Sequence, residues 1–135
     1  MKKSKIISYV MALLICIMSF TSPIVAAEAR NTNTTQTVTN FYISDTGVSI
    51  VYVDYMGIEG MVTSATITLS IKKRVALFFW SEVASHTFNS TDTDFKATYQ
   101  HTLDSKGTYK CNVEYAISGV TGVTDIIPFE DTATY

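Results

Sequence analysis

The sequence predicts an all-β protein, an antiparallel β-sandwich of about seven strands. Several runs of residues alternate apolar and polar side chains with a period of two, as half-buried strands do. Turn-forming residues separate these runs, which is typical of hairpins and sandwiches. After the first 30 residues, no segment shows the apolar spacing of an amphipathic helix. Because strands with one apolar face need a second layer to bury it, the pattern favours two packed sheets.

The first 27 residues predict a signal peptide for secretion. Three lysines lie among the first five residues, an apolar helical run follows over residues 6–20, and small residues follow it. We expect cleavage after Ala27, with Ala29 as the alternative site. The apolar run is shorter than the roughly 18 to 20 residues that span a bilayer, which favours cleavage over a retained membrane anchor. The protein is therefore expected to be extracellular.

The mature chain, residues 28–135, has the length of one domain. Residues 31–39 are rich in threonine and asparagine, which predicts a flexible leader over residues 28–40 or a poorly ordered first strand. Residues 41–135 predict the sandwich domain. The signal peptide removes three lysines, so 7 basic residues remain against 12 acidic ones, a net charge near −5. This charge argues against nucleic acid and against a polyanionic surface as partners. The chain ends directly after the last predicted strand, and we expect a released protein.

Cys111 is the one cysteine of the mature chain, so no intramolecular disulfide is expected. One interpretation is a reactive thiol or a disulfide-linked dimer. The favoured interpretation is a small buried residue, because Cys111 shares the face of its predicted strand with Tyr109, Val113 and Tyr115. A secreted domain without a disulfide framework, behind a lysine-led signal peptide, is more typical of a bacterium than of an animal.

The predicted strands are residues 41–43, 48–56, 62–73, 80–88, 95–103, 109–117 and 123–134. The strand at 48–56 carries apolar residues on both faces, which predicts neighbours on both sides. The strand at 62–73 alternates most clearly. Pro128 confines the last strand to a sheet edge or a bulge, because proline cannot donate to a ladder of hydrogen bonds.

A turn at residues 104–107 precedes Tyr109, which lies two residues before Cys111. This arrangement resembles the tyrosine corner of immunoglobulin-like sandwiches. The resemblance implies that the Tyr109 hydroxyl bonds a backbone group near residues 103–105. Tyr115 lies outside the corner and is expected to have no such partner.

A second feature is similar to the same family. An inward residue, Ile67 or Leu69, precedes Trp80 by a spacing close to that between the family's first cysteine and its tryptophan. No cysteine stands at 67 or 69, so apolar packing must replace the bridge between the sheets. The resemblance implies an immunoglobulin-like sandwich, similar in style to small secreted sandwich proteins of Gram-positive bacteria. It implies no binding residue.

The sequence holds no metalloprotease, phosphate-loop, dinucleotide-binding or serine-hydrolase motif. His86 and His101 would supply two zinc ligands if their strands paired in a hairpin, but zinc needs three or four. Asp92 and Asp94 share one loop, but calcium needs six to eight oxygens. We therefore expect no metal, no cofactor and no enzymatic activity.

The most unusual segment joins three cations directly to six apolar residues, 75–80. An antiparallel strand with one face in water should alternate, and this segment does not, so the favoured interpretation is a core strand buried on both faces. The alternative is an exposed apolar patch beside positive charge, which would bind a partner or a membrane surface. The candidate binding residues are Lys72, Lys73, Arg74, Leu77, Phe78, Phe79 and Trp80.

These observations predict a secreted, non-catalytic β-sandwich module that binds a protein or a cell-surface ligand. The alternative function is a membrane-active secreted factor, antimicrobial or toxin-like, that uses residues 72–80 on a membrane surface.

Overall fold

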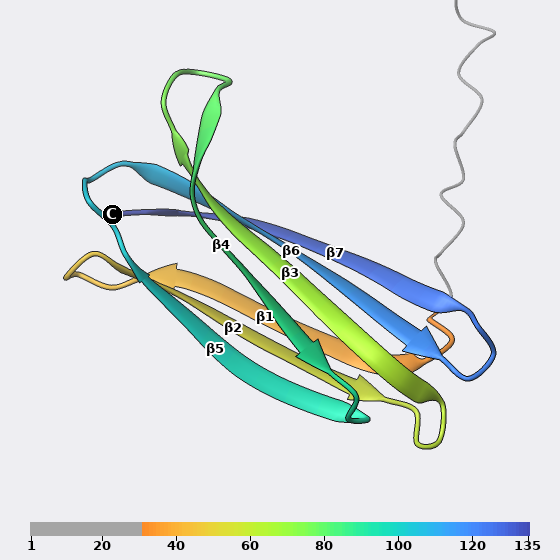
Figure 1. The fold of residues 1–135 in the computed structure, drawn as a ribbon. Helices are drawn as coiled ribbons and strands as arrows, with labels where there is room; N and C mark the ends of the chain where they lie inside the picture. Colours follow the sequence, from red (N-terminus) through yellow and green to blue (C-terminus); the bar gives the residue numbers. More distant parts are fainter. Residues whose placement is uncertain (1–30) are drawn as a thin grey trace, which may run out of the picture.

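The computed structural model describes residues 31–135, which form seven β-strands in two layers (Figure 1). The predicted signal peptide and the first residues of the leader lie outside the described part. The strands are β1 (Thr34–Ile43), β2 (Val48–Gly57), β3 (Val62–Arg74), β4 (Trp80–Ser90), β5 (Asp94–Thr102), β6 (Thr108–Gly119) and β7 (Thr124–Thr134).

The strands form two antiparallel sheets. One has the order β1-β2-β5 and the other the order β4-β3-β6-β7. This is the order of an immunoglobulin-like sandwich, in which β2 takes the place of strand B, β3 of strand C, β4 of C′ and β6 of strand F. The predicted fold class is confirmed. Pro128 lies on β7, at the edge of the four-stranded sheet, as its missing amide requires.

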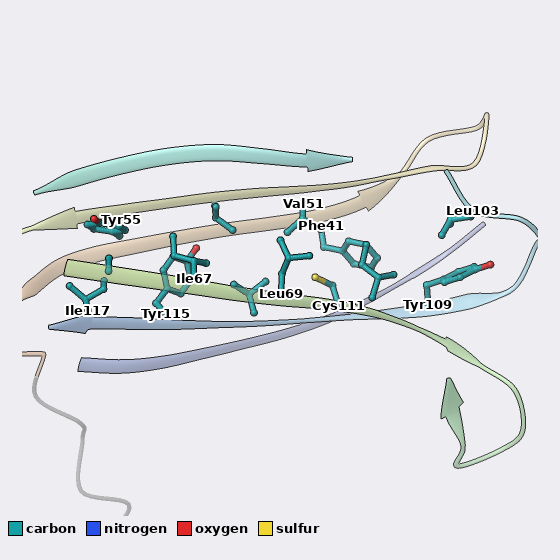
Figure 2. Close-up of a cluster of buried hydrophobic side chains, with 14 residues drawn as sticks. Phe41, Val51, Tyr55, Ile67, Leu69, Leu103, Tyr109, Cys111, Tyr115 and Ile117 are labelled. Atoms are coloured by element: carbon teal, nitrogen blue, oxygen red, sulfur yellow. The ribbon is translucent and has the colours of Figure 1, made fainter. Parts of the chain in front are cut away.

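Alternation along the central strands builds the core between the sheets. On β3 the inward residues are buried and their neighbours are partly or fully exposed, as the sequence predicts. β2 lies between β1 and β5, which explains why its outward residues are also half buried. Figure 2 shows the core side chains directed from both sheets into one layer. The buried core consists of Phe41, Val51, Val53, Tyr55, Ala65, Ile67, Leu69, Ile71, Leu103, Tyr109, Cys111, Val113, Tyr115 and Ile117.

The first strand begins earlier than expected. Residues 34–40, assigned to a flexible leader, pair with β2 as the first part of β1. The sandwich therefore starts at Thr34 rather than at residue 41. Threonine-rich sequence carries little apolar periodicity, but threonine suits a strand whose hydrogen bonds come from a neighbour.

A buried polar contact fixes the chain where it enters β1. The backbone amides of Thr32 and Asn33 donate to the two carboxylate oxygens of Asp125, over 2.8 and 2.7 Å. The side-chain amide of Asn33 donates to the carbonyls of Ile117 and Val123. These bonds tie the start of the first sheet to the β6–β7 turn of the second sheet.

The tyrosine corner is present. The Tyr109 hydroxyl donates to the carbonyl of Ser105 over 2.5 Å, within the expected stretch. Tyr115 lies outside the corner, as expected, but its hydroxyl has partners elsewhere: it donates to the carbonyl of Val38 over 3.0 Å and lies 2.6 Å from the Thr39 hydroxyl. Tyr115 thus joins β6 to β1 across the sandwich, a contact that no local pattern reveals.

The second part of the family correspondence is shifted by one strand. Ile67 and Leu69 lie on β3, which is hydrogen-bonded to β6 within the same sheet, so neither position could carry a bridge between the sheets. The position of strand B in the immunoglobulin-like sandwich is occupied by β2. Trp80 is the first residue of β4 and lies partly exposed, outside the core.

We predict that Tyr109→Phe and Tyr115→Phe each lower the free energy of unfolding by about 1 to 2 kcal/mol, because each removes one bond to a backbone carbonyl. The loss at Tyr115 should equal or exceed that at Tyr109, whose partner Ser105 is exposed and can be hydrated. Urea unfolding measures both. Tyr42→Phe is the control, since Tyr42 is 51% exposed. A loss at Tyr109 no larger than the control's would show that the corner bond contributes nothing.

Candidate functional site

The β3–β4 hairpin extends beyond the sheet that carries it. The last pair between β3 and β6 is Lys73 with Tyr109, and only the Arg74–Trp80 pair of the hairpin lies further out. Residues 75–79, here called the hairpin tip, connect the two strands. Figure 1 shows the tip projecting from one end of the sandwich.

A β-bulge bends the hairpin on its way out. Ile71 pairs with Ala84 and Lys72 with Glu82, so Val83 has no partner on β3. A bulge increases the local twist and bends its strand. The bend lies where the hairpin begins to leave the sheet (Figure 1).

Backbone hydrogen bonds close the hairpin tip. The Phe79 amide donates to the Ala76 carbonyl over 3.2 Å, and the Val75 amide donates to the Phe79 carbonyl over 2.9 Å. The first of these bonds makes residues 76–79 a β-turn. Leu77 and Phe78 occupy its two central positions, whose side chains point outward from the chain reversal.

The apolar side chains of the tip are exposed. Leu77 is 79%, Phe78 86%, Phe79 69% and Val75 62% exposed. The favoured interpretation of this run, a core strand buried on both faces, is therefore wrong. β6 and β7 do not reach the tip, so no strand of the described residues 31–135 covers it.

A cation–aromatic contact braces the base of the hairpin. The ammonium group of Lys110, on β6, lies 4.6 Å from the centre of the Trp80 ring. Lys110 also pairs with Glu130 over 3.5 Å, and the Asn112 amide donates to the same carboxylate over 2.7 Å. Asn112 first, and then Lys110, hold the pKa of Glu130 below its ordinary value.

The three candidate cations lie just behind the tip. Lys73 reaches the turn before β6, where its ammonium group bonds the Ser105 hydroxyl and lies 5.9 Å from the centre of the Tyr109 ring. Arg74 is exposed and Lys72 is half buried. Within residues 31–135, neither side chain has a carboxylate oxygen within 4.0 Å. The structure thus brings the seven candidate binding residues to one end of the molecule.

The histidines do not form the pair that a metal site would need. β4 and β5 belong to different sheets, so His86 and His101 do not face each other in a hairpin. The His86 ring stacks on Tyr99 instead, with 4.9 Å between ring centres. Asp94 accepts a bond from the Gly57 amide. In the described chain, no group of three or more histidine, cysteine or acidic side chains could hold a metal ion.

Two surface hollows among residues 31–135 contain acidic side chains, but neither holds an acid paired with a base for catalysis. A hollow of about 600 Å³ on the outer face of the four-stranded sheet contains Glu114 and Glu130, but it is open to solvent. Glu130 is held by Lys110 and Asn112, as described above. A second hollow of similar volume beside β1 contains Asp131, alongside mainly aromatic, amide and hydroxyl side chains.

Cys111 is fully buried between the sheets and is a free thiol. Burial, and then the nearby Asp131 carboxylate, raise the pKa of the thiol to about 12. A thiolate is the reactive form of cysteine, so this site is protected from reagents and oxidants as long as the protein is folded.

Fold and site together define an immunoglobulin-like β-sandwich module with an apolar, exposed hairpin at one end. No family model matches the chain, and no curated protein matches it. The chain is similar to a solved structure, the CARDB domain of a Pyrococcus furiosus protein, crystallised in complex with di-metal ions. Its identity is 11%, its TM-score is 0.43, and the match covers 76% of this chain and 90% of that domain. A likeness of this size assigns neither activity nor ligand.

Among residues 31–135, no helix is long and apolar enough to cross a membrane.

We predict that the native protein reacts slowly with thiol reagents at pH 8 and quickly in denaturant. The pKa of Cys111 is higher in the folded than in the unfolded state, so its contribution to stability is complete below about pH 8.5 and decreases toward pH 12. Cys111→Ala should cost about 1 to 2 kcal/mol at pH 7. The variant should also lose less stability than wild type between pH 9 and 10.5. Parallel pH profiles, or fast native labelling, would contradict a buried thiol.

Proposed function

We propose that this protein is a secreted, non-catalytic β-sandwich module that binds a protein or cell-surface ligand through the hairpin tip. The observation that carries the proposal is the exposure of Leu77, Phe78 and Phe79, three large apolar side chains on consecutive residues. Soluble monomers seldom expose contiguous apolar surface without a binding role.

The construction of the hairpin supports a binding surface. Hydrogen bonds fix the tip backbone, the bulge at Val83 directs it away from the sheet, and the Lys110–Trp80 contact supports its base. A surface held in one conformation before binding loses little conformational entropy when a ligand arrives. Binding surfaces are also enriched in aromatic residues and arginine. The hairpin tip contains Phe78 and Phe79, and Arg74 lies directly behind it.

Three further parts of the proposal depend on the sequence. The signal-peptide pattern of residues 1–27 supports secretion, and the lysine-led signal with a disulfide-free mature domain supports a bacterial source. The open hollows and the unpaired histidines support a role without catalysis.

The test compares the complete protein with a triple variant, Leu77→Ser, Phe78→Ser and Phe79→Ser, in binding to intact Gram-positive and animal cells. We expect at least a tenfold loss of binding with an unchanged melting temperature, because these side chains contact solvent rather than the core. The matched control is Val120→Ser with Val123→Ser, which removes exposed apolar side chains from the β6–β7 turn. Equal loss in both variants, or no loss in the triple variant, would refute a role of the tip.

A further inference from the structure

We propose that the ligand of the hairpin tip is the interfacial region of an anionic lipid bilayer. This inference rests on the proposed function and names the partner of the same surface. In this arrangement the hairpin tip inserts into the bilayer, and Lys72, Lys73 and Arg74 contact the lipid phosphates. Trp80 lies at the level of the headgroups.

The shape of the tip favours a fluid partner. Leu77 and Phe78 stand at the centre of a tight turn and are 79% and 86% exposed, so they present apolar surface on a convex end. A protein partner would need a deep apolar pocket to receive such a projection. Acyl chains and headgroups rearrange around it, and amphipathic segments insert to a depth of about 5 to 10 Å at this boundary.

The order of side chains along the hairpin matches the layers of a bilayer surface. The tip comes first, the Arg74–Trp80 pair lies directly behind it, and Lys73 and Lys72 follow on β3. Tryptophan is enriched at the level of the headgroups, where its ring is apolar and its N–H stays hydrated. Lysine and arginine beside an inserted segment reach the phosphates with their flexible side chains.

The net charge of the mature chain is negative, but its charges are distributed unevenly between the two ends of the sandwich. Lys72, Lys73 and Arg74 are joined at the same end by Lys106, in the turn before β6, and by Lys110, near the start of β6. Acidic residues are present at this end as well, namely Asp45, Glu82, Asp104, Glu130 and Asp131. The net charge of the half of the molecule that carries the hairpin is therefore close to zero.

The opposite half holds the negative charge. There Lys96 is the one cation among the described residues, and it is paired with Asp54 over 3.2 Å. The acidic residues of this half and of the middle of the sandwich are Asp54, Glu59, Asp92, Asp94, Glu114 and Asp125. An anionic membrane repels this half, so the molecule approaches with the hairpin first.

The chain contains its own probe, because Trp80 is its single tryptophan and lies beside the tip. The complete protein is titrated with vesicles of phosphatidylcholine alone and with vesicles containing 30% phosphatidylglycerol. We expect the Trp80 emission to move several nanometres to the blue and to be quenched by lipids that carry a bromine or nitroxide near the headgroup. Affinity should be at least tenfold higher with phosphatidylglycerol and should fall in 0.5 M salt.

Three variants separate the contributions. The triple serine variant at residues 77–79 should lose binding to both kinds of vesicle. Lys72→Gln with Arg74→Gln should lose only the preference for phosphatidylglycerol. The control at Val120 and Val123 should bind as wild type does.

The vesicle result and the cell-binding result are separable. If wild type binds neither kind of vesicle while cell binding still depends on the tip, the lipid proposal is overturned and the proposed function stands, with a protein or another cell-surface molecule as the ligand. Vesicle binding that survives in the triple variant would also overturn the lipid proposal, because another surface would then contact the membrane.

Discussion

The structure depends on the burial of two apolar sheet faces against each other without a covalent link between them. Val51 and Val53 face inward from β2, and Leu69 and Ile71 face inward from β3. Cys111 is the one thiol of the described chain and is unpaired. Packing must therefore hold the sheets together, at roughly 25 cal/mol for each Å² of apolar surface removed from water. Each inward position must therefore carry a side chain that fills its part of the apolar layer between the sheets.

Three buried tyrosines show how polar groups enter such a core. Tyr55, Tyr109 and Tyr115 are almost fully buried, and the hydroxyl of each donates to a backbone carbonyl: those of Asp92, Ser105 and Val38. The rings add apolar area, while the hydroxyls fix a loop, a corner and an edge strand. Each bond also removes the cost of an unpaired buried hydroxyl. The tyrosines thus supply part of the connection that a disulfide provides in related folds.

Because the core lies between the sheets, the β3–β4 hairpin can extend past it without loss of packing. β3 continues beyond its last pair with β6, and the tip residues take no part in the core. The apolar residues 75–79 are therefore not needed to hold the sandwich together. Their exposed apolar side chains can therefore contact a ligand without loss of stability.

Local patterns in the sequence predicted the strands, the inward face of β3, the burial of Cys111 and the tyrosine corner, because each depends on neighbours along the chain. Strand pairing could not be predicted in this way. Trp80 was placed wrongly because β4 pairs with β3 at the edge of its sheet. Whether His86 and His101 face each other could not be decided from the sequence, because β5 belongs to the other sheet.

The start of the first strand was assigned to a leader, and the exposed hairpin tip was only the alternative interpretation, for a related reason. The Thr- and Asn-rich residues 34–40 become a strand because β2 offers them hydrogen bonds. The unbroken apolar run 75–80 favoured a core strand, and its exposure is decided by how far β6 extends beside β3. The residues of these two segments alone do not reveal the pairing of the first or the exposure of the second.

The central claim is that stability resides in the sandwich and ligand contact in the hairpin tip. Replacing the tip turn by Ala76→Asn, Leu77→Pro, Phe78→Asp and Phe79→Gly keeps its length and supplies residues suited to a turn. The free energy of unfolding in urea, measured for this variant and for wild type, tests the claim directly. The account predicts values within about 0.5 kcal/mol of each other. A loss of about 2 kcal/mol or more would show that the tip packs as part of the core and would contradict it.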